Sequence, residues 1–170
     1  MIDLSNVEVG TEHIELVRHF LSSEDGDPWN YDEPTIPSDV MAHNLMGYSA
    51  FAVAVLRKFS PTYSVSEIIQ YVAELRKALL GEESLEVNPR VAEGLIRDVL
   101  QDKTLTDTPP FGADNETMAK TSFVVLLDLA HDADLAGPSL DEFLRESADY
   151  ARRWLEAQRA GDAEEQSTIS

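Results

Sequence analysis

A nearly continuous apolar run over residues 45–56 does most to limit what this chain can fold into. Three less apolar or smaller residues interrupt it: Gly47, Tyr48 and Ser49. A membrane helix needs about 20 apolar residues, so the run is too short to span a bilayer. A helix that is apolar on all sides belongs instead at the centre of a folded domain. Residues 51–55 also resemble a buried strand, but the length of the run and the lack of a turn signal favour a helix.

Helix start signals recur along the chain and predict six helices. Ser64–Glu67 and Ser139–Glu142 have the spacing of capping boxes, in which a hydroxyl and a carboxylate each accept from an unpaired backbone amide. Thr11 is expected to cap the first helix, and Asn88 precedes a proline at a first helical position. Asp114 or Asn115 opens the fifth helix. The expected helices span residues 12–22, 39–58, 65–80, 89–102, 115–131 and 139–159.

The pattern predicts an all-α fold, a single-domain bundle with two apolar central helices and four amphipathic helices around them. The second apolar stretch is 123–127, in the fifth helix. We expect the side chains at the centre to be fully buried and to touch across the second and fifth helices: Phe51, Val55, Leu126 and Leu127. The domain is expected to cover residues 1–159, followed by a frayed polar tail over 160–170.

The composition excludes several classes of protein. The chain has 170 residues, enough for one core, and no cysteine, which excludes disulfides, thiolate metal sites and cysteine nucleophiles. The N-terminal residues lack the basic and apolar regions of a signal peptide, so a cytoplasmic location is expected. We find no acyl-transfer, nucleotide-binding or kinase motif, which favours a protein that is not an enzyme.

The formal net charge of −19 is the most unusual bulk property. Residues 1–37 carry nine acids and one base, whereas residues 38–81 have a net charge of +1. Such a chain repels nucleic-acid phosphates and attracts basic surfaces, so no nucleic-acid partner is expected. An acidic source proteome is an alternative explanation, and the nine arginines against four lysines fit it.

The histidines and acids give weak signals for metal or catalytic chemistry. His13 and His19 lie six residues apart on different helix faces, so both are expected at the surface. Asp128 and His131 share a face, and Asp128 is expected to pair with His131 or an arginine. The acids of residues 25–33 have the ligand type for calcium but lack the EF-hand spacing. We therefore expect neither a metal site nor a cofactor.

The leading hypothesis is an acidic interaction domain of the inhibitor, immunity or regulatory type, which binds a basic surface on a protein partner. A long connection over residues 23–37 places aromatic side chains among acids, a combination that protein interfaces favour. The residues expected to bind the partner are Asp25, Asp27, Trp29, Tyr31, Asp32 and Glu33.

Two alternatives remain open at this stage. One is a small helical enzyme or ligand-binding protein with a pocket between the second and fifth helices, lined by His43, Asn44, Tyr48 and Asp128. The other is a homodimer that forms through the long, amphipathic sixth helix.

Overall fold

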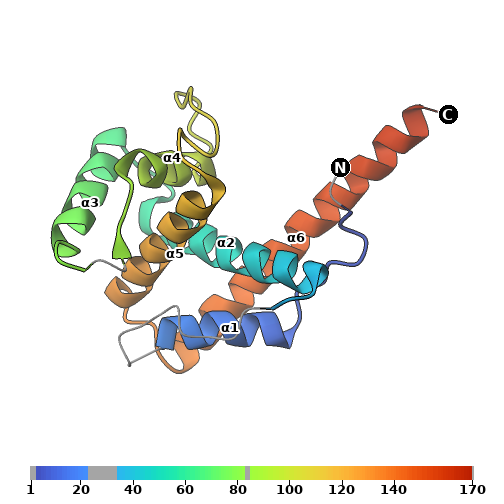
Figure 1. The fold of residues 1–170 in the computed structure, drawn as a ribbon, viewed down its shortest axis with the longest axis horizontal. Coiled ribbons are helices and arrows are strands. Elements are labelled where there is room, and N and C mark those ends of the chain that lie inside the picture. The colour runs from blue at the N-terminus through green and yellow to red at the C-terminus, as the bar shows by residue number, and fades with distance from the viewer. Residues whose placement is uncertain (1–2, 23–33, 83–84, 170) are drawn as a thin grey trace. The chain divides into compact units, whose positions relative to one another are not determined.

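The computed structural model describes residues 3–22, 34–82 and 85–169 (Figure 1). Within these ranges no residue forms a strand, which confirms the all-α fold class. Residues 51–55 are helical, so the strand alternative is wrong. The helices are α1 (Thr11–Ser22), α2 (Pro37–Phe59), α3 (Val65–Ala78), α4 (Pro89–Val99), α5 (Asn115–Asp132) and α6 (Pro138–Thr168).

The chain divides into two compact units of equal length. The terminal unit comprises residues 1–50 and 136–170, and the middle unit comprises residues 51–135. The division falls within α2, so the first part of that helix belongs to the terminal unit and its end to the middle unit. A single domain over residues 1–159 stays a prediction.

In the terminal unit, α1 packs against α6 (Figure 1). Arg18 of α1 forms an ion pair with Asp141 of α6. The predicted apolar stripe of α6 is buried, and Leu155 is its last buried residue. Residues 3–10 precede α1 and contribute Val7 and Val9 to the buried core. The core of this unit is therefore formed by apolar residues from four segments: Val7, Val17, Phe20, Met46, Phe143 and Leu144.

In the middle unit, α4 packs against both α3 and α5. Phe51, Val55 and Leu126 are completely buried, as predicted, whereas Leu127 is half-buried, so the prediction for Leu127 is wrong. The side chain of Leu127 comes directly after Leu126 and turns toward a different face of α5. Contact between α2 and α5 through these residues stays a prediction.

The connection between α4 and α5 is fixed to α4 at three places. The Arg90 guanidinium lies 2.7 Å from the Asp107 carboxylate, and Arg97 Nε lies 2.8 Å from Asp102 Oδ2. The Phe111 ring is buried directly over Gly94, where an added Cβ would lie 2.6 Å from the ring. Glycine at this helical position therefore lets the ring approach the backbone.

Several helix ends follow the sequence signals and others do not. Ser64, Asn88 and Asp114 cap their helices through side-chain oxygens, as predicted. The Ser139 prediction is wrong, because α6 begins one residue earlier and the Ser139 hydroxyl bonds to the backbone of Ala136. Thr11 is the first residue of α1 rather than its cap. The expected end of the last helix near residue 159 is also wrong, because α6 continues to Thr168.

Candidate interaction surface

The six residues predicted to bind a partner fall in the range 23–33, which lies outside the described residues. Their role stays a prediction: Asp25, Asp27, Trp29, Tyr31, Asp32 and Glu33. The other acids of the terminal unit form an acidic surface along the N-terminal segment and α6.

Two arginines of α6 hold the N-terminal segment through its backbone. Arg152 Nη2 donates to the Val9 carbonyl over 3.1 Å. Arg159 Nη2 donates to the Leu4 and Val7 carbonyls over 3.0 and 2.6 Å. These contacts use neutral carbonyl oxygens as acceptors. Arg152 Nη1 also lies 3.7 Å from the Asp149 carboxylate.

The remaining arginines of the terminal unit also have partners within it. The Asp141 carboxylate hydrogen-bonds to Arg18 and raises its pKa, with Glu15 adding a second contact. Arg145 lies 3.9 Å from a carboxylate oxygen of Glu142, and the Arg153 side chain donates to a backbone carbonyl. The unit contains 18 acids and five arginines, a net charge of −13, and every one of those arginines is engaged internally.

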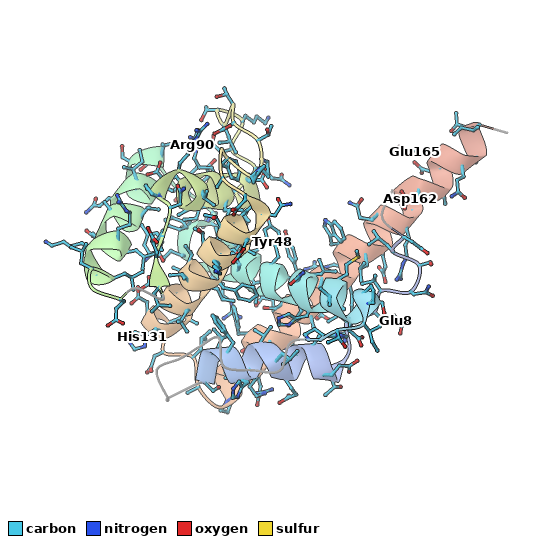
Figure 2. The ribbon with its side chains drawn as sticks, in the orientation of Figure 1. Glu8, Tyr48, Arg90, His131, Asp162 and Glu165 are labelled. Carbon is cyan, nitrogen blue, oxygen red and sulfur yellow. The ribbon has the colours of Figure 1, made fainter. Side chains whose placement is uncertain are left out.

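An exposed and a half-buried carboxylate line a groove of about 550 Å³ between the N-terminal segment and α6. Asp3 of the N-terminal segment and Asp162 of α6 both line it, together with Arg159. The Ser5 hydroxyl and amide donate to the Asp3 carboxylate and lower its pKa, so this group stays ionised well below neutral pH. Glu8 extends the acidic surface along the same segment (Figure 2).

The C-terminal part of α6 adds further negative charge. None of its described side chains after Leu155 is buried, and it carries Asp162 and Glu165 (Figure 2) together with Glu156 and Glu164. The last turn contains no basic residue. Since unpaired carbonyls give a helix a partial negative charge at its C-terminus, the backbone dipole and the side chains have the same sign here.

His13 does not lie at the surface, so that expectation is wrong. Its side chain is 2% exposed, and its Nδ1 accepts from the Gly10 amide over 2.9 Å, as a capping carboxylate does at this helix position. Nε2 lies 3.5 Å from Oδ1 of Asp39, which belongs to α2. His19 is exposed, as expected.

Glu12, His13 and Asp39 are close enough together to be compared with a metal site. A neutral histidine that binds a metal through Nε2 carries its proton on Nδ1 and donates from there. In this protein Nδ1 is the acceptor for Gly10, which places the proton of the neutral ring on Nε2, facing Asp39. Nε2 forms no hydrogen bond among the described residues, so the bond from Gly10 to Nδ1 and the packing of the ring support a structural role within the terminal unit.

The four residues of the alternative pocket have different environments. His43 is buried, Tyr48 is half-buried and Asn44 is exposed, and all three belong to the terminal unit. Asp128 belongs to the middle unit, where the Tyr71 hydroxyl donates to Asp128 Oδ2 over 2.7 Å. The expected pairing of Asp128 with His131 or an arginine is therefore wrong.

Burial raises the pKa values of both partners in this hydrogen bond. For Tyr71 the loss of hydration is the largest cause, and the neighbouring Asp128 carboxylate adds to it. For Asp128 burial is again the largest cause, although the Tyr71 hydrogen bond lowers the pKa in opposition. The pair supports the fold of the middle unit by satisfying a half-buried carboxylate with a neutral donor.

Sequence reasoning missed the role of the α6 arginines. Arg152 and Arg159 lie seven residues apart, so the helical repeat places them on one face, and this spacing was a usable signal. Their targets are backbone carbonyls of residues 4–9, which carry no mark in the sequence.

A comparison with protein-family models finds no match, and comparisons with curated proteins and with solved structures find none either. Among the described residues, no helix combines the length and the apolar character that crossing a membrane requires.

Proposed function

We propose that this protein is an acidic interaction module that binds a basic surface on a protein partner, as an inhibitor, immunity protein or regulator does. The observation that supports the proposal is the internal use of all five arginines in the terminal unit, against 18 acids. The unit is left with a large uncompensated negative charge, carried in part by exposed carboxylates around the groove and along α6.

The physical basis is long-range attraction. Complementary charge speeds the encounter between two proteins and selects against partners of the same sign. Such attraction is screened over about 8 Å at physiological ionic strength, so it depends strongly on salt. The same field opposes contact between two copies of the terminal unit, and a homodimer through α6 stays a prediction that sedimentation can test.

The proposal is tested by the binding of a fluorescently labelled arginine-rich peptide, followed by anisotropy. A terminal-unit variant neutralises four exposed or groove-lining acids: Asp3→Asn, Glu8→Gln, Asp162→Asn and Glu165→Gln. A matched middle-unit variant also removes four charges: Glu67→Gln, Glu82→Gln, Asp98→Asn and Asp134→Asn. We expect the first variant to weaken binding by about tenfold and the second by less than about twofold.

Equal weakening in the two variants would show that the peptide responds to total charge rather than to the terminal unit. That result would contradict the proposal. Circular dichroism of both variants serves as a control for folding, because all of the substituted side chains are at least partly exposed.

The acidic connection before α2 requires its own test. Trp29→Ala should abolish partner binding while leaving the melting temperature unchanged if this aromatic residue anchors a partner. A loss of about 3–5 kcal/mol in the free energy of unfolding would instead identify Trp29 as a buried structural residue. Neutralising Asp25, Asp27, Asp32 and Glu33 in an otherwise native chain should slow association and reduce its dependence on salt.

A further inference from the structure

A cavity of about 500 Å³ lies in the middle unit, where the ends of three helices meet. Arg76 comes from the last turn of α3, and residues 86–89 lead into α4. Thr117, Lys120 and Thr121 come from α5 and share one face of it, because they are separated by three and four residues. The volume lies within the range of small-molecule sites, which is about 300–1,000 Å³.

Thr121 is the polar residue of this cavity that points most directly to a ligand. It is 1% exposed, and no hydrogen bond joins its hydroxyl to any other residue that the structure describes. The Thr121 oxygen is not among the described side-chain atoms that are sealed from solvent without a partner, so water can reach it from the cavity. A molecule bound in the cavity is in place to replace that water as its hydrogen-bond partner.

Asn88 adds a second set of donors. Its Oδ1 accepts from the amides of Arg90 and Val91 at the start of α4. The carbonyl half of this side chain is therefore engaged, and the part left to interact with a ligand is the N–H₂ group. With the Thr121 hydroxyl, the cavity offers neutral donors from α4 and α5, whereas the Thr117 side chain already bonds to the Asp114 carboxylate.

The cavity also brings together two cations in a strongly acidic chain. Arg76 is exposed and forms no ion pair within the described residues. Lys120 lies 2.8 Å from Glu116, but both side chains are more than half exposed, so this pair is weak and Lys120 can turn to a ligand. Glu86 is the acid in the lining, and no ion pair in the described chain joins it to either cation.

We propose that this cavity binds the phosphate group of a small, soluble phosphorylated compound with an apolar body. The planar guanidinium of Arg76 matches two phosphate oxygens, and Lys120 and the neutral donors serve the others. The site is in the middle unit and is cationic, so it stands independently of the proposed binding of a basic partner.

An adjoining groove of about 360 Å³ accommodates the apolar body of this compound. It shares Arg76, Glu86 and Val87 with the phosphate cavity, so the two adjoin. Leu79, Leu80 and Leu85 also line it, and Leu80 is 81% exposed. A large apolar side chain left in solvent beside an anion cavity favours a ligand that is charged at one end and apolar at the other.

The test is isothermal titration calorimetry of the full chain at low ionic strength with phenyl phosphate, inorganic phosphate and phenol. We expect saturable binding of phenyl phosphate, weaker binding of inorganic phosphate and none of phenol. Arg76→Gln should weaken phenyl phosphate binding by about tenfold, because a charge-assisted bidentate contact is lost. Lys77→Gln removes the same charge from the next residue, which does not line the cavity, and should change affinity by less than about twofold.

Thr121→Val gives a second readout that a purely structural role would not produce. It should weaken phenyl phosphate binding by about fivefold while leaving the ligand-free melting temperature unchanged or raised, since no hydrogen bond of the free protein is lost. The proposal is overturned by the absence of saturable binding to the wild-type chain or by equal losses in Arg76→Gln and Lys77→Gln. Binding to phosphatidic acid vesicles but not to phenyl phosphate also overturns it, because the ligand is then a membrane lipid.

Discussion

The two units of this chain have the same length but use their charges differently. The terminal unit has a net charge of −13, and the middle unit has 14 acids and eight bases, a net of −6. In the middle unit, Arg90 and Arg97 form close ion pairs with Asp107 and Asp102 and fix the connection that follows α4. In the terminal unit, three of the five arginines donate to backbone carbonyls.

This difference bears on the origin of the acidity. An acidic source proteome explains a low isoelectric point, but by itself it predicts a similar charge on two units of equal length. The observed difference places most of the uncompensated charge in one unit. An uneven charge, with one region more acidic than the other, favours charge-guided recognition of a partner.

The largest effect is expected in the core of the middle unit. Leu126 is completely buried, so Leu126→Ala should lower the free energy of unfolding by about 2–5 kcal/mol in urea denaturation. Leu80→Ala, at a position that is 81% exposed, is the control and should change it by less than about 0.5 kcal/mol. Equal effects at the two positions would show that the burial of Leu126 is incorrectly assigned.

Replacing a helical glycine with alanine should change the free energy of unfolding in opposite directions in the two units. Gly94→Ala in α4 places a Cβ 2.6 Å from the buried Phe111 ring and should destabilise by about 1–3 kcal/mol. Gly161→Ala in α6 meets no atom within 4 Å and should stabilise by about 0.5–1 kcal/mol through helix propensity alone. Thermal melts should show a lower melting temperature for Gly94→Ala and a higher one for Gly161→Ala. Stabilisation by Gly94→Ala would contradict the packing of Phe111.

A smaller effect on the free energy of unfolding is expected from the contacts that attach the N-terminal segment to α6. Arg159→Gln removes the donors to the Leu4 and Val7 carbonyls and should cost about 1 kcal/mol in the free energy of unfolding. Arg153→Gln is the matched control on the same helix, because its guanidinium reaches one exposed carbonyl, and it should cost less than about 0.5 kcal/mol. If Arg159→Gln left the free energy of unfolding unchanged, the segment would be held by Val7 and Val9 alone.

The smallest effect concerns the acid stability of the middle unit. The Arg97 guanidinium and the Thr104 amide and hydroxyl lower the pKa of Asp102 to about 2, from an ordinary value of 3.8. Since the pKa is lower in the folded chain than in the unfolded chain, the stabilisation is present above pH 3.8 and is lost as the pH falls toward 2. Asp102→Asn should therefore flatten the pH dependence of stability between pH 4 and 2, measured by denaturation at each pH. The same slope in the wild type and the variant would contradict the lowered pKa.

The sequence predicted the number and approximate position of the helices because their start signals are local. Ser64, Asn88 and Asp114 each bond to amides within three residues, so their roles depend only on their immediate neighbours. The apolar stripes followed in the same way from helical spacing. The end of α6 was missed because the last turns are polar on all sides and give no periodic signal.

The features that were not predicted depend on residues distant in the sequence. His13 is buried, and its Nε2 lies 3.5 Å from Asp39 of another helix, a contact that helical position alone does not indicate. Phe111 packs on Gly94 across 17 residues, and Arg159 reaches carbonyls at the other end of the chain. The acidic surface of the terminal unit was in part predicted from composition, but the internal engagement of its arginines required the fold.

The central claim is that the uncompensated charge of the terminal unit attracts a basic partner. The most direct measurement is the association rate of the arginine-rich peptide with three proteins at increasing salt: the wild type and the two four-site variants described above. We predict a steep fall in rate with salt for the wild type and the middle-unit variant, and a slower, flatter response for the terminal-unit variant. The same salt dependence in the two variants would contradict the claim.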